Sequence, residues 1–418
     1  MISPIARNHI ENEIKTVMRP MNSDFWKLTS AAVFLTSAMY MLVFPMLPFL
    51  TATFGLSRLQ AAVVIGIPGI AAFTLGVFCS YLIQRYRRNK VCTASIVIVA
   101  AAMLFMAYVP NEYNMEKLII ESPVILIAAR FVMGAFFGLA LMVINGTLVI
   151  DSCVSQVRTK ANVISSWAHL AAVPLGAVIG ILVYSESGIR NVFYTSATFC
   201  LIAAGVISSI RFPFKAPEEN LHKCSTDRFL VRSGMPIIIS AIGIGVSAGS
   251  VTMEITAPGD FPLILSGMLI SVLSLCLAYR HKYVKATGKA ELLSGRKNVL
   301  SLSVAGYVLL VFSVSTQNIA LLHTPDMLIL GVSLPAVLTA VHCCFIETAD
   351  HCRRGSAVST YYLMLELGIY TGIFIHVWNP CLVQYLSCES VCSPAIAAAL
   401  LSALSFFIFV RRHIAGNK

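Results

Sequence analysis

Residues 129–151 read ARFVMGAFFGLALMVINGTLVID, a run whose only charged residues are Arg130 and Asp151, one near each end. A helix of about 20 such residues crosses the roughly 30 Å hydrocarbon layer of a membrane. Arg130, Gly134 and Gly138 are spaced by four and lie on one helix face, where glycines allow a neighbouring helix to approach closely. The run therefore predicts a membrane-spanning helix packed tightly against another helix.

The composition of the whole chain agrees with this prediction. Of its 418 residues, 57% are hydrophobic and 12% are charged, whereas soluble proteins average about 25% charged residues. A soluble core cannot hide so much apolar side chain, so most of it must face lipid. The chain also has neither a nucleotide-binding P-loop nor an HExxH zinc motif. We therefore expect no enzyme, no nucleotide-driven pump, no cofactor and no metal.

Polar loops divide the chain into apolar segments that are each long enough to span a membrane as a helix. Twelve segments result, near residues 29–50, 60–83, 91–109, 124–150, 161–184, 192–211, 235–253, 261–279, 298–315, 327–346, 356–377 and 394–410. A charged stretch separates six segments from six, which predicts an all-α integral membrane protein of two six-helix bundles. The expected parts are a cytoplasmic arm, a first bundle, a linker, a second bundle and a tail, at 1–28, 29–211, 212–233, 234–410 and 411–418.

The basic residues predict how the chain is oriented in the membrane. Of the 30 lysines and arginines, 26 lie on one side, in the two ends of the chain and in the loops of that side. Arg58, Lys117 and Arg190 lie on the other side, and Arg130 lies within a segment. Loops rich in Lys and Arg stay in the cytoplasm, so we expect both termini there, in a cell (inner) membrane protein. The net charge of +11 thus reflects topology and does not indicate a nucleic-acid partner.

Most of the twelve cysteines stand alone in apolar segments, where cysteine behaves as a small hydrophobic residue. Two clusters leave other interpretations open. Cys343, Glu347 and His351 recur every four residues and could present metal ligands, although helix packing beside a solvated turn explains the same pattern better. In a predicted periplasmic loop, a disulfide could join two of Cys381, Cys388 and Cys392.

The loop between the second and third segments, GVFCSYLIQRYRRNK (residues 76–90), resembles the loop signature of the major facilitator superfamily. The basic positions of that signature are matched by Arg85, Arg88 and Lys90. Gln84 replaces its acidic residue and Arg87 its glycine. In the family these charges pair with neighbouring helix ends and latch the outward-facing state, so the resemblance implies a gating role with a weakened latch. A positive-inside loop with no gating role would carry the same basic residues.

The fourth segment supplies the strongest resemblance to this family, whose R-x-x-x-G-x-x-x-G helix is matched by Arg130, Gly134 and Gly138. Similar stretches occur at three other matching places: DSCVSQVR from Asp151 to Arg158, GIRNVF from Gly188, and RRGSA from Arg353. The resemblance implies that Arg130 takes part in proton coupling. Alternatively, Arg130, about 9 Å inside the membrane, extends its side chain to the surface. The resemblance also implies a substrate cavity between the two bundles.

The fifth segment contains AAVPLGAVIG (residues 171–180), which is loosely similar to the glycine–proline motif of drug and proton antiporters. Pro174 precedes Gly176 instead of following a glycine, so the antiporter branch stays open. Gly176 and Gly180 are four residues apart and predict a second close helix contact.

Glu366 is predicted to lie deep in the membrane, roughly 15 Å from either end of the eleventh segment. Tyr362, Glu366 and Tyr370 are spaced by four and form one polar stripe on that helix. A charge at such depth costs a few kcal/mol and is normally paired or set in a wet cavity. Glu366 is therefore a candidate for carrying a proton or for binding a cationic group of a substrate. A hydrogen bond that only joins two helices is the alternative.

Two further polar residues are candidates for the same cavity. Asn145 lies close to the helix face of Gly134 and Gly138, where it could be a cavity donor or form a bond between helices. His169, in the fifth segment, is a candidate for a proton relay because histidine as a residue type can gain and lose a proton near neutral pH, although single histidines in membranes are commonly satisfied by one neighbour.

These observations predict a monomeric secondary transporter that moves a small organic solute by alternating access, with the solute, protons and the lipid bilayer as its partners. Proton-coupled export in the manner of the drug-efflux branch is the favoured subclass. An uptake symporter or uniporter for a metabolite is the first alternative. A membrane sensor or scaffold that keeps the fold without transporting is the second.

Overall fold

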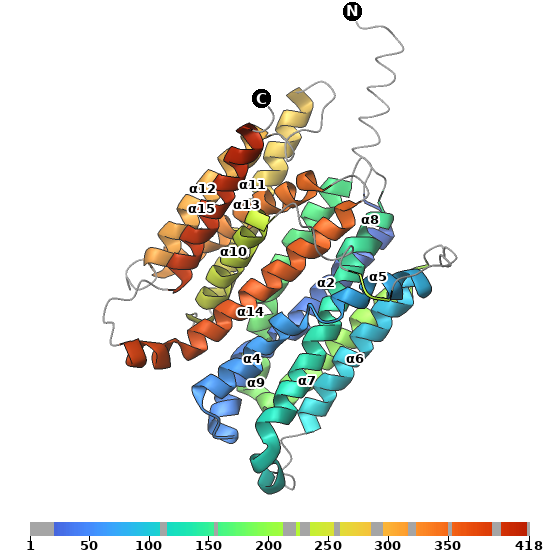
Figure 1. Ribbon diagram of the computed structural model, residues 1–418, viewed down its shortest axis with the longest axis vertical. Helices are drawn as coiled ribbons and strands as arrows, with labels where there is room; N and C mark the ends of the chain where they lie inside the picture. Colours follow the sequence, from blue (N-terminus) through green and yellow to red (C-terminus); the bar gives the residue numbers. More distant parts are fainter. Residues whose placement is uncertain are drawn as a thin grey trace, which may run out of the picture.

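The computed structural model describes residues 21–108, 115–153, 158–211, 223–225, 235–254, 260–285, 296–316, 323–349, 353–386 and 394–415. Regular secondary structure in these residues is helical throughout, with no strand. The long helices run side by side, and the start of the first described helix and the end of the last lie at the same end of the molecule (Figure 1). The predicted all-helical architecture is confirmed.

The helices of the two halves have the following bounds. The first half contains α2 (Ser23–Tyr40), α3 (Val43–Pro48), η1 (Phe49–Thr53), α4 (Arg58–Ala71), α5 (Gly76–Arg85), α6 (Arg88–Tyr108), α7 (Met115–Val143), η3 (Ile144–Leu148), α8 (Val149–Asp151) and α9 (Arg158–Ser208). The second half contains α10 (Met235–Glu254), α11 (Asp260–Lys285), α12 (Arg296–Thr316), α13 (His323–Thr348), α14 (Arg354–Leu386) and α15 (Pro394–Ala415). Every predicted segment overlaps helical residues.

The described helices differ in how fully they meet the requirements of a membrane span. Six spans are long and apolar enough, and the pair α4 and α5, bent by 45°, makes a seventh when it is counted as one span. Four further apolar helices of 10–17 residues are Ile237–Met253, Pro262–Cys276, Leu300–Thr316 and Pro394–Val410. The chain is therefore a multi-pass membrane protein, and the number of twelve crossings stays a prediction, as do the predicted bounds of its parts.

Helix α9 contains a break at the place where segments five and six were expected to separate. Gly188 has φ +76° and ψ 175°, which lies outside the helical region. A residue with a Cβ is strained at such a φ, whereas glycine adopts it readily. Two helices therefore meet at Gly188.

The four glycines of the predicted packing faces lie against neighbouring backbones. A Cβ on Gly134 would come within 2.4 Å of Pro68 Cα, and one on Gly138 within 2.2 Å of the Ala72 carbonyl, both at the α4 side of the first half. On α9, the corresponding Cβ atoms would meet carbonyl oxygens of α2, with Gly176 facing Ser37 and Gly180 facing Met41. These contacts bring α7 against α4 and α9 against α2 at backbone distance.

Helix α14 belongs to the second half of the chain but packs against both halves. It lies between α10 and α4 (Figure 1), and it also contacts η3. Near its start, a Cβ on Gly355 would lie 2.5 Å from the Gly146 carbonyl of η3. Further along, Tyr370 faces Gly69 of α4, whose added Cβ would lie 2.6 Å from the Tyr370 Cβ. The middle of α14 is thereby held at the boundary between the halves.

Candidate functional site

Glu366 lies in the middle of α14, fully buried, and is bonded to two helices of the other half. The Tyr40 hydroxyl of α2 donates a hydrogen bond to Glu366 Oε2 at 2.9 Å. His169 Nε2 of α9 lies 2.8 Å from Glu366 Oε1, which makes an ion pair when the imidazole is protonated. Both carboxyl oxygens therefore have a partner across the boundary, as a buried carboxylate requires.

The His169 ring is held from its other side by α2. Its Nδ1 lies 3.0 Å from Thr36 Oγ1, and either atom can donate, depending on which ring nitrogen carries the proton. Thr36 and Tyr40 are one helical turn apart on α2, so the same face of that helix reaches both His169 and Glu366. The result is a polar chain from Thr36 through His169 and Glu366 to Tyr40, which joins α2, α9 and α14.

Aromatic side chains border this polar chain. Tyr370 stacks on Tyr40 with ring centroids 5.7 Å apart and an interplanar angle of 19°. Tyr362 meets the His169 ring edge-on, at 5.0 Å and 85°. The hydroxyls of Tyr362 and Tyr370 are buried and make no hydrogen bond within the part of the chain that the structure describes. The whole predicted stripe of α14 thus faces the other half, and its two tyrosine hydroxyls are available to bind a ligand or water.

Arg130 is also fully buried, but its partners are backbone carbonyls of its own half. Pro68 of α4 has no N–H, so the Val64 carbonyl four residues earlier lacks its normal helical donor. Arg130 Nε donates to that carbonyl oxygen at 3.3 Å, and Nη2 donates to the Ile65 oxygen at 3.2 Å. These bonds hold the Arg130 guanidinium inside the first half, against α4.

The third nitrogen of the Arg130 guanidinium, Nη1, is buried and has no hydrogen-bond partner among the described residues. The guanidinium also lies close to the Tyr370 side chain, and the two groups interact electrostatically. Arg130 therefore borders the same polar region as Glu366, separated from it by the Tyr370 ring.

Asn145 lies in the π-helical turn η3, where it contacts α9. Its Oδ1 accepts a hydrogen bond from Ser165 of α9 at 2.8 Å. Its Nδ2 is buried with no partner among the residues described. The next residue, Gly146, is the one that contacts Gly355 of α14. Single π-helical turns are frequent at functional sites.

Several residues of this region were not predicted from the sequence. Tyr40 and Thr36 stand in an apolar segment, and their spacing of four was the signal available. His342 of α13 is fully buried, stacks on Tyr361 at 4.2 Å, and has no hydrogen-bond partner for either ring nitrogen in the described chain. Trp167 Nε1 of α9 donates to Thr339 Oγ1 of α13 at 2.7 Å, which makes another bond between the halves.

The predicted gating residues lie at the end of the bundle where α5, α6 and α8 meet. Arg88 forms an ion pair with Asp151, so the carboxylate that Gln84 lacks is supplied by the end of the fourth segment. Arg158 instead donates to the carbonyl oxygens of Ile150 and Cys153, at 3.2 and 3.3 Å, beside the end of α8. The structure records no ion pair for Arg85 or Lys90 among the described residues, and both are exposed.

The cysteine clusters fall partly outside the described residues. No group of three His, Cys, Asp or Glu side chains that could hold a metal occurs among the residues the structure covers, and His351 lies outside them. Of the three loop cysteines, Cys388 and Cys392 lie outside the described residues, as does the side chain of Cys381. The predicted arm and linker also fall largely outside, whereas 411–415 of the predicted tail belong to the end of α15.

One stretch has the spacing of a hydrolase nucleophile motif: GVSAG, residues 245–249. In hydrolases the serine of this motif stands on a sharp turn between a strand and a helix. Here Ser247 lies inside α10 and donates to the carbonyl oxygens of Gly243 and Ala395, at 3.0 and 2.9 Å. The serine serves helix packing and is no nucleophile.

Comparisons with known proteins agree with this architecture. No curated protein sequence matches the chain. The crystal structure of the human organic anion transporter MFSD10 (TETRAN) is similar, with a TM-score of 0.59 at 12% identity over 93% of this chain and 100% of that chain. The nucleoside transporter NupG, crystallised as a point mutant, has a TM-score of 0.56 at 13% identity, over 95% and 100% of the two chains.

The crystal structure of a D-xylose-proton symporter has a TM-score of 0.61 at 12% identity, over 93% of this chain and 96% of that one. At such low identity these likenesses show a common fold. The family itself follows from the sequence, which matches the Major Facilitator Superfamily over residues 29–373. That match spans most of both halves, and so the chain belongs to the Major Facilitator Superfamily.

Proposed function

We propose that this protein couples the movement of a small organic solute to protonation of Glu366, and that it exports the solute by alternating access. Membership of the family makes the chain a membrane transporter of small solutes and not an enzyme. The observation that carries the coupling is the bonding of one buried carboxylate to His169 and Tyr40, which belong to the other half.

The proposed coupling follows from what a proton does to these bonds. An ionised Glu366 accepts two charge-assisted hydrogen bonds, each worth about 1.5–3 kcal/mol. Protonation removes the negative charge, so both bonds weaken together and the two halves are held less firmly. A change of about 1.4 kcal/mol shifts the balance between two conformations tenfold. One proton is therefore sufficient to favour separation of the halves on one side.

Few ionisable groups compete with this role. Those facing Glu366 are Tyr40 from α2, His169 from α9 and Tyr370 from α14 itself, with Arg130 of α7 behind Tyr370. The helices packed beside α14 at this level, α4 and α10, carry ionisable side chains only at one end, Arg58 and Glu254. His342 of α13 lies beyond Tyr362, at 6.0 Å from that ring.

The substrate cavity is proposed to border this polar chain. Four buried polar groups on α7, η3 and α14 have no hydrogen-bond partner among the described residues: Arg130 Nη1, Asn145 Nδ2 and the hydroxyls of Tyr362 and Tyr370. Buried polar groups are nearly always hydrogen-bonded in folded proteins, so such a cluster indicates that a ligand or water completes it. All four can donate, which suits a solute that carries oxygen acceptors.

The loop residues are proposed to govern the switch between conformations. The ion pair of Arg88 and Asp151 joins α6 to the end of the fourth segment, and Arg158 joins the start of α9 to the same place through the Ile150 carbonyl. Arg85 and Lys90 belong to the same loop and supply its positive charge. We expect replacement of Arg85 or Arg88 by Ala to slow transport while ligand affinity stays within a few fold.

The direction of transport separates two candidates. Export rests on the likeness of the loop after the second segment to drug and proton antiporters, while the position of Pro174 in the fifth segment departs from their motif. Uptake by symport is the second candidate, because a D-xylose-proton symporter shares the fold over 93% of this chain. With an inward proton gradient, an antiporter moves the solute against the protons and a symporter moves it with them.

The proposal is tested in two steps. A thermal-shift screen of the purified protein against metabolites and drugs identifies a solute, because a ligand of the folded state raises its apparent stability. Proteoliposomes with an imposed pH gradient then report solute movement and its direction. Gradient-driven flux that disappears in Glu366→Gln supports the coupling. Solute flux that is independent of the pH gradient in the wild type refutes the coupling. A protein that binds solutes but does not transport them is a sensor.

The orientation is proposed from the basic residues: both termini and the linker 212–233 lie in the cytoplasm of a cell (inner) membrane. Cys224 is exposed and lies in that linker, so it reports the orientation directly. We expect a membrane-impermeant maleimide to label Cys224 only after the cells are opened. The Cys224→Ser variant identifies that label against the other cysteines. Labelling of Cys224 in intact cells would reverse the orientation.

A further inference from the structure

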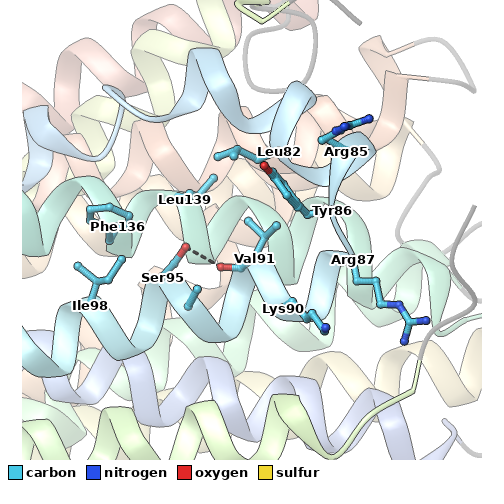
Figure 2. Close-up of a pocket in the computed structure, with 11 residues that line it drawn as sticks. Leu82, Arg85, Tyr86, Arg87, Lys90, Val91, Ser95, Ile98, Phe136 and Leu139 are labelled. Atoms are coloured by element: carbon cyan, nitrogen blue, oxygen red, sulfur yellow. Dashed lines mark hydrogen bonds between the residues drawn. The ribbon is translucent and has the colours of Figure 1, made fainter. Parts of the chain in front are cut away.

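A groove with a volume of about 490 Å³ opens on the outer side of the first half, between α5, α6 and α7. Its floor and walls are apolar along most of its length, with Leu82, Val91, Ile98, Phe136 and Leu139 among the lining residues (Figure 2). The hydroxyl of Ser95, which also lines it, donates to the Val91 carbonyl at 2.8 Å and so offers no free polar group. A groove of this kind accepts a hydrocarbon chain.

The groove is basic at one end. Arg85, Arg87 and Lys90 line it there, and no acidic side chain is among its lining residues (Figure 2). Tyr86 lies at the same end and is 53% exposed, as is typical of aromatic residues at the level of lipid headgroups. Charge and apolar surface are therefore separated along one groove, as they are along a phospholipid.

The length of the groove agrees with a lipid lying along α6. Lys90 and Ile98 are both lining residues, and eight residues of helix extend about 12 Å. One leaflet of the hydrocarbon layer is about 15 Å thick. A headgroup phosphate at Lys90 would thus place an acyl chain beside Ile98 and Phe136.

We propose that this groove is a binding site for an anionic phospholipid of the leaflet on the side of the two termini, with its headgroup at Arg85, Arg87 and Lys90 and one acyl chain against Ile98 and Phe136. The site is separate from the polar region around Glu366. It lies on the outer surface of the first half, where lipid and not transported solute is the neighbour. Charge complementarity selects an anionic headgroup, since each Lys or Arg near such lipid contributes about fivefold in affinity.

The headgroup part of the proposal is tested by native mass spectrometry of the full-length protein in detergent. We expect phosphatidylglycerol to bind more tightly than phosphatidylcholine, and the double variant Arg85→Gln with Lys90→Gln to lose about 25-fold in affinity for phosphatidylglycerol. The matched control is Arg353→Gln with Arg354→Gln, two exposed arginines of the same basic side outside the groove. An equal loss in the control, or no headgroup preference in the wild type, overturns the proposal.

The acyl part is tested by filling the groove. Ala94 lines it and is exposed, so Ala94→Phe should lower phosphatidylglycerol affinity at least tenfold without any change in charge. Ala101→Phe, an exposed alanine two turns further along α6 and outside the groove, should leave the affinity unchanged. Two results together would show a site for free anions and refute the lipid assignment. Inorganic phosphate would bind the wild type as tightly as the lipid does, and Ala94→Phe would leave the affinity for phosphatidylglycerol unchanged. Equal thermal stability of the variants in lipid-free detergent excludes misfolding as the cause.

Discussion

Arg130 and Glu366 are both fully buried charges that make two hydrogen bonds each, yet their partners differ in kind. Arg130 bonds to the backbone carbonyls of Val64 and Ile65 within its own half. Glu366 bonds to the side chains of Tyr40 and His169 in the other half. A carbonyl of a packed helix neither titrates nor moves away, whereas a side chain across a boundary can do both. The first charge therefore braces one half, and the second joins two halves that must separate.

The largest effect on transport is expected when the charge of Glu366, which joins the two halves, is removed. Glu366→Gln keeps the shape of the side chain and one acceptor oxygen, replaces the other oxygen by an NH2 donor, and cannot take up a proton. We expect gradient-driven solute transport in proteoliposomes to fall at least a hundredfold, while exchange of solute across the membrane continues because exchange needs no net proton movement.

The same variant distinguishes the other roles of Glu366. Loss of solute binding would assign the carboxylate to a cationic group of the substrate, since an unpaired buried charge costs about 3–5 kcal/mol. Poor expression and low thermal stability would indicate a purely structural bond. Gradient-driven transport at the wild-type rate and with the wild-type pH dependence would remove Glu366 from the mechanism altogether.

A smaller effect is expected at the partner of Glu366. His169→Gln places an amide N–H near the position of Nε2, so a hydrogen bond to the Glu366 carboxylate remains. The positive charge that a protonated imidazole carries is lost, together with the contact of Nδ1 with Thr36. Because the acceptor keeps its charge, we expect the transport rate to change by several fold and not to be abolished. The pH profile of transport should also become narrower. An unchanged profile would show that His169 only positions the carboxylate.

Replacement of Arg130 should lower the thermal stability of the protein more than it affects the coupling of transport to protons. Arg130→Gln leaves the Val64 carbonyl without a donor, at about 1–3 kcal/mol, and should lower the thermal melting temperature. Pro68→Ala restores a backbone N–H to that carbonyl, so Arg130→Gln should be about 1 kcal/mol less destabilising in the Pro68→Ala background. A double-mutant cycle on thermal stability measures the difference. Strict additivity would refute the link between Pro68 and Arg130.

The smallest effect is expected at the ion pair of Arg88 and Asp151, whose side chains are 31% and 42% exposed. An exposed pair contributes about 0.2–1 kcal/mol, so Arg88→Gln should change the transport rate by a few fold and leave solute affinity unaltered. Exchange of the two charges, Arg88→Asp with Asp151→Arg, should restore part of the rate. A large loss of affinity in Arg88→Gln would place this residue in binding instead of switching.

Local features of this molecule could be predicted from the sequence. Apolar length predicted the helical segments, and the GIRNVF stretch marked the boundary at which Gly188 breaks α9. Glycines spaced by four indicated faces that approach a neighbouring backbone, although not which neighbour. The place of Glu366 in the middle of one apolar segment agrees with its burial among helices, whereas its depth in the membrane stays a prediction.

Pairings across the molecule could not be predicted in this way. Tyr40 and Glu366 are 326 residues apart in the chain, and His169 and Glu366 are 197 apart. No periodicity within one segment states which face of another it meets. The two carbonyl partners of Arg130 could not be predicted either. Pro68 leaves the Val64 carbonyl without a backbone donor, but only the packing of α7 beside α4 shows that Arg130 supplies one.

The position of Glu366 on α14 has a mechanical consequence. Gly355, which touches Gly146, lies about 16 Å along the helix on one side of Glu366, and Phe374, which touches Gly66, lies about 12 Å on the other. If α14 tilts as a rigid helix about Glu366, its two ends move in opposite directions. Moving Gly355 away from Gly146 by 4 Å then moves Phe374 toward Gly66 by about 3 Å. Because Phe374 already contacts α4, α4 must shift as the contact at Gly355 opens. Such leverage would prevent both ends of the boundary from opening together.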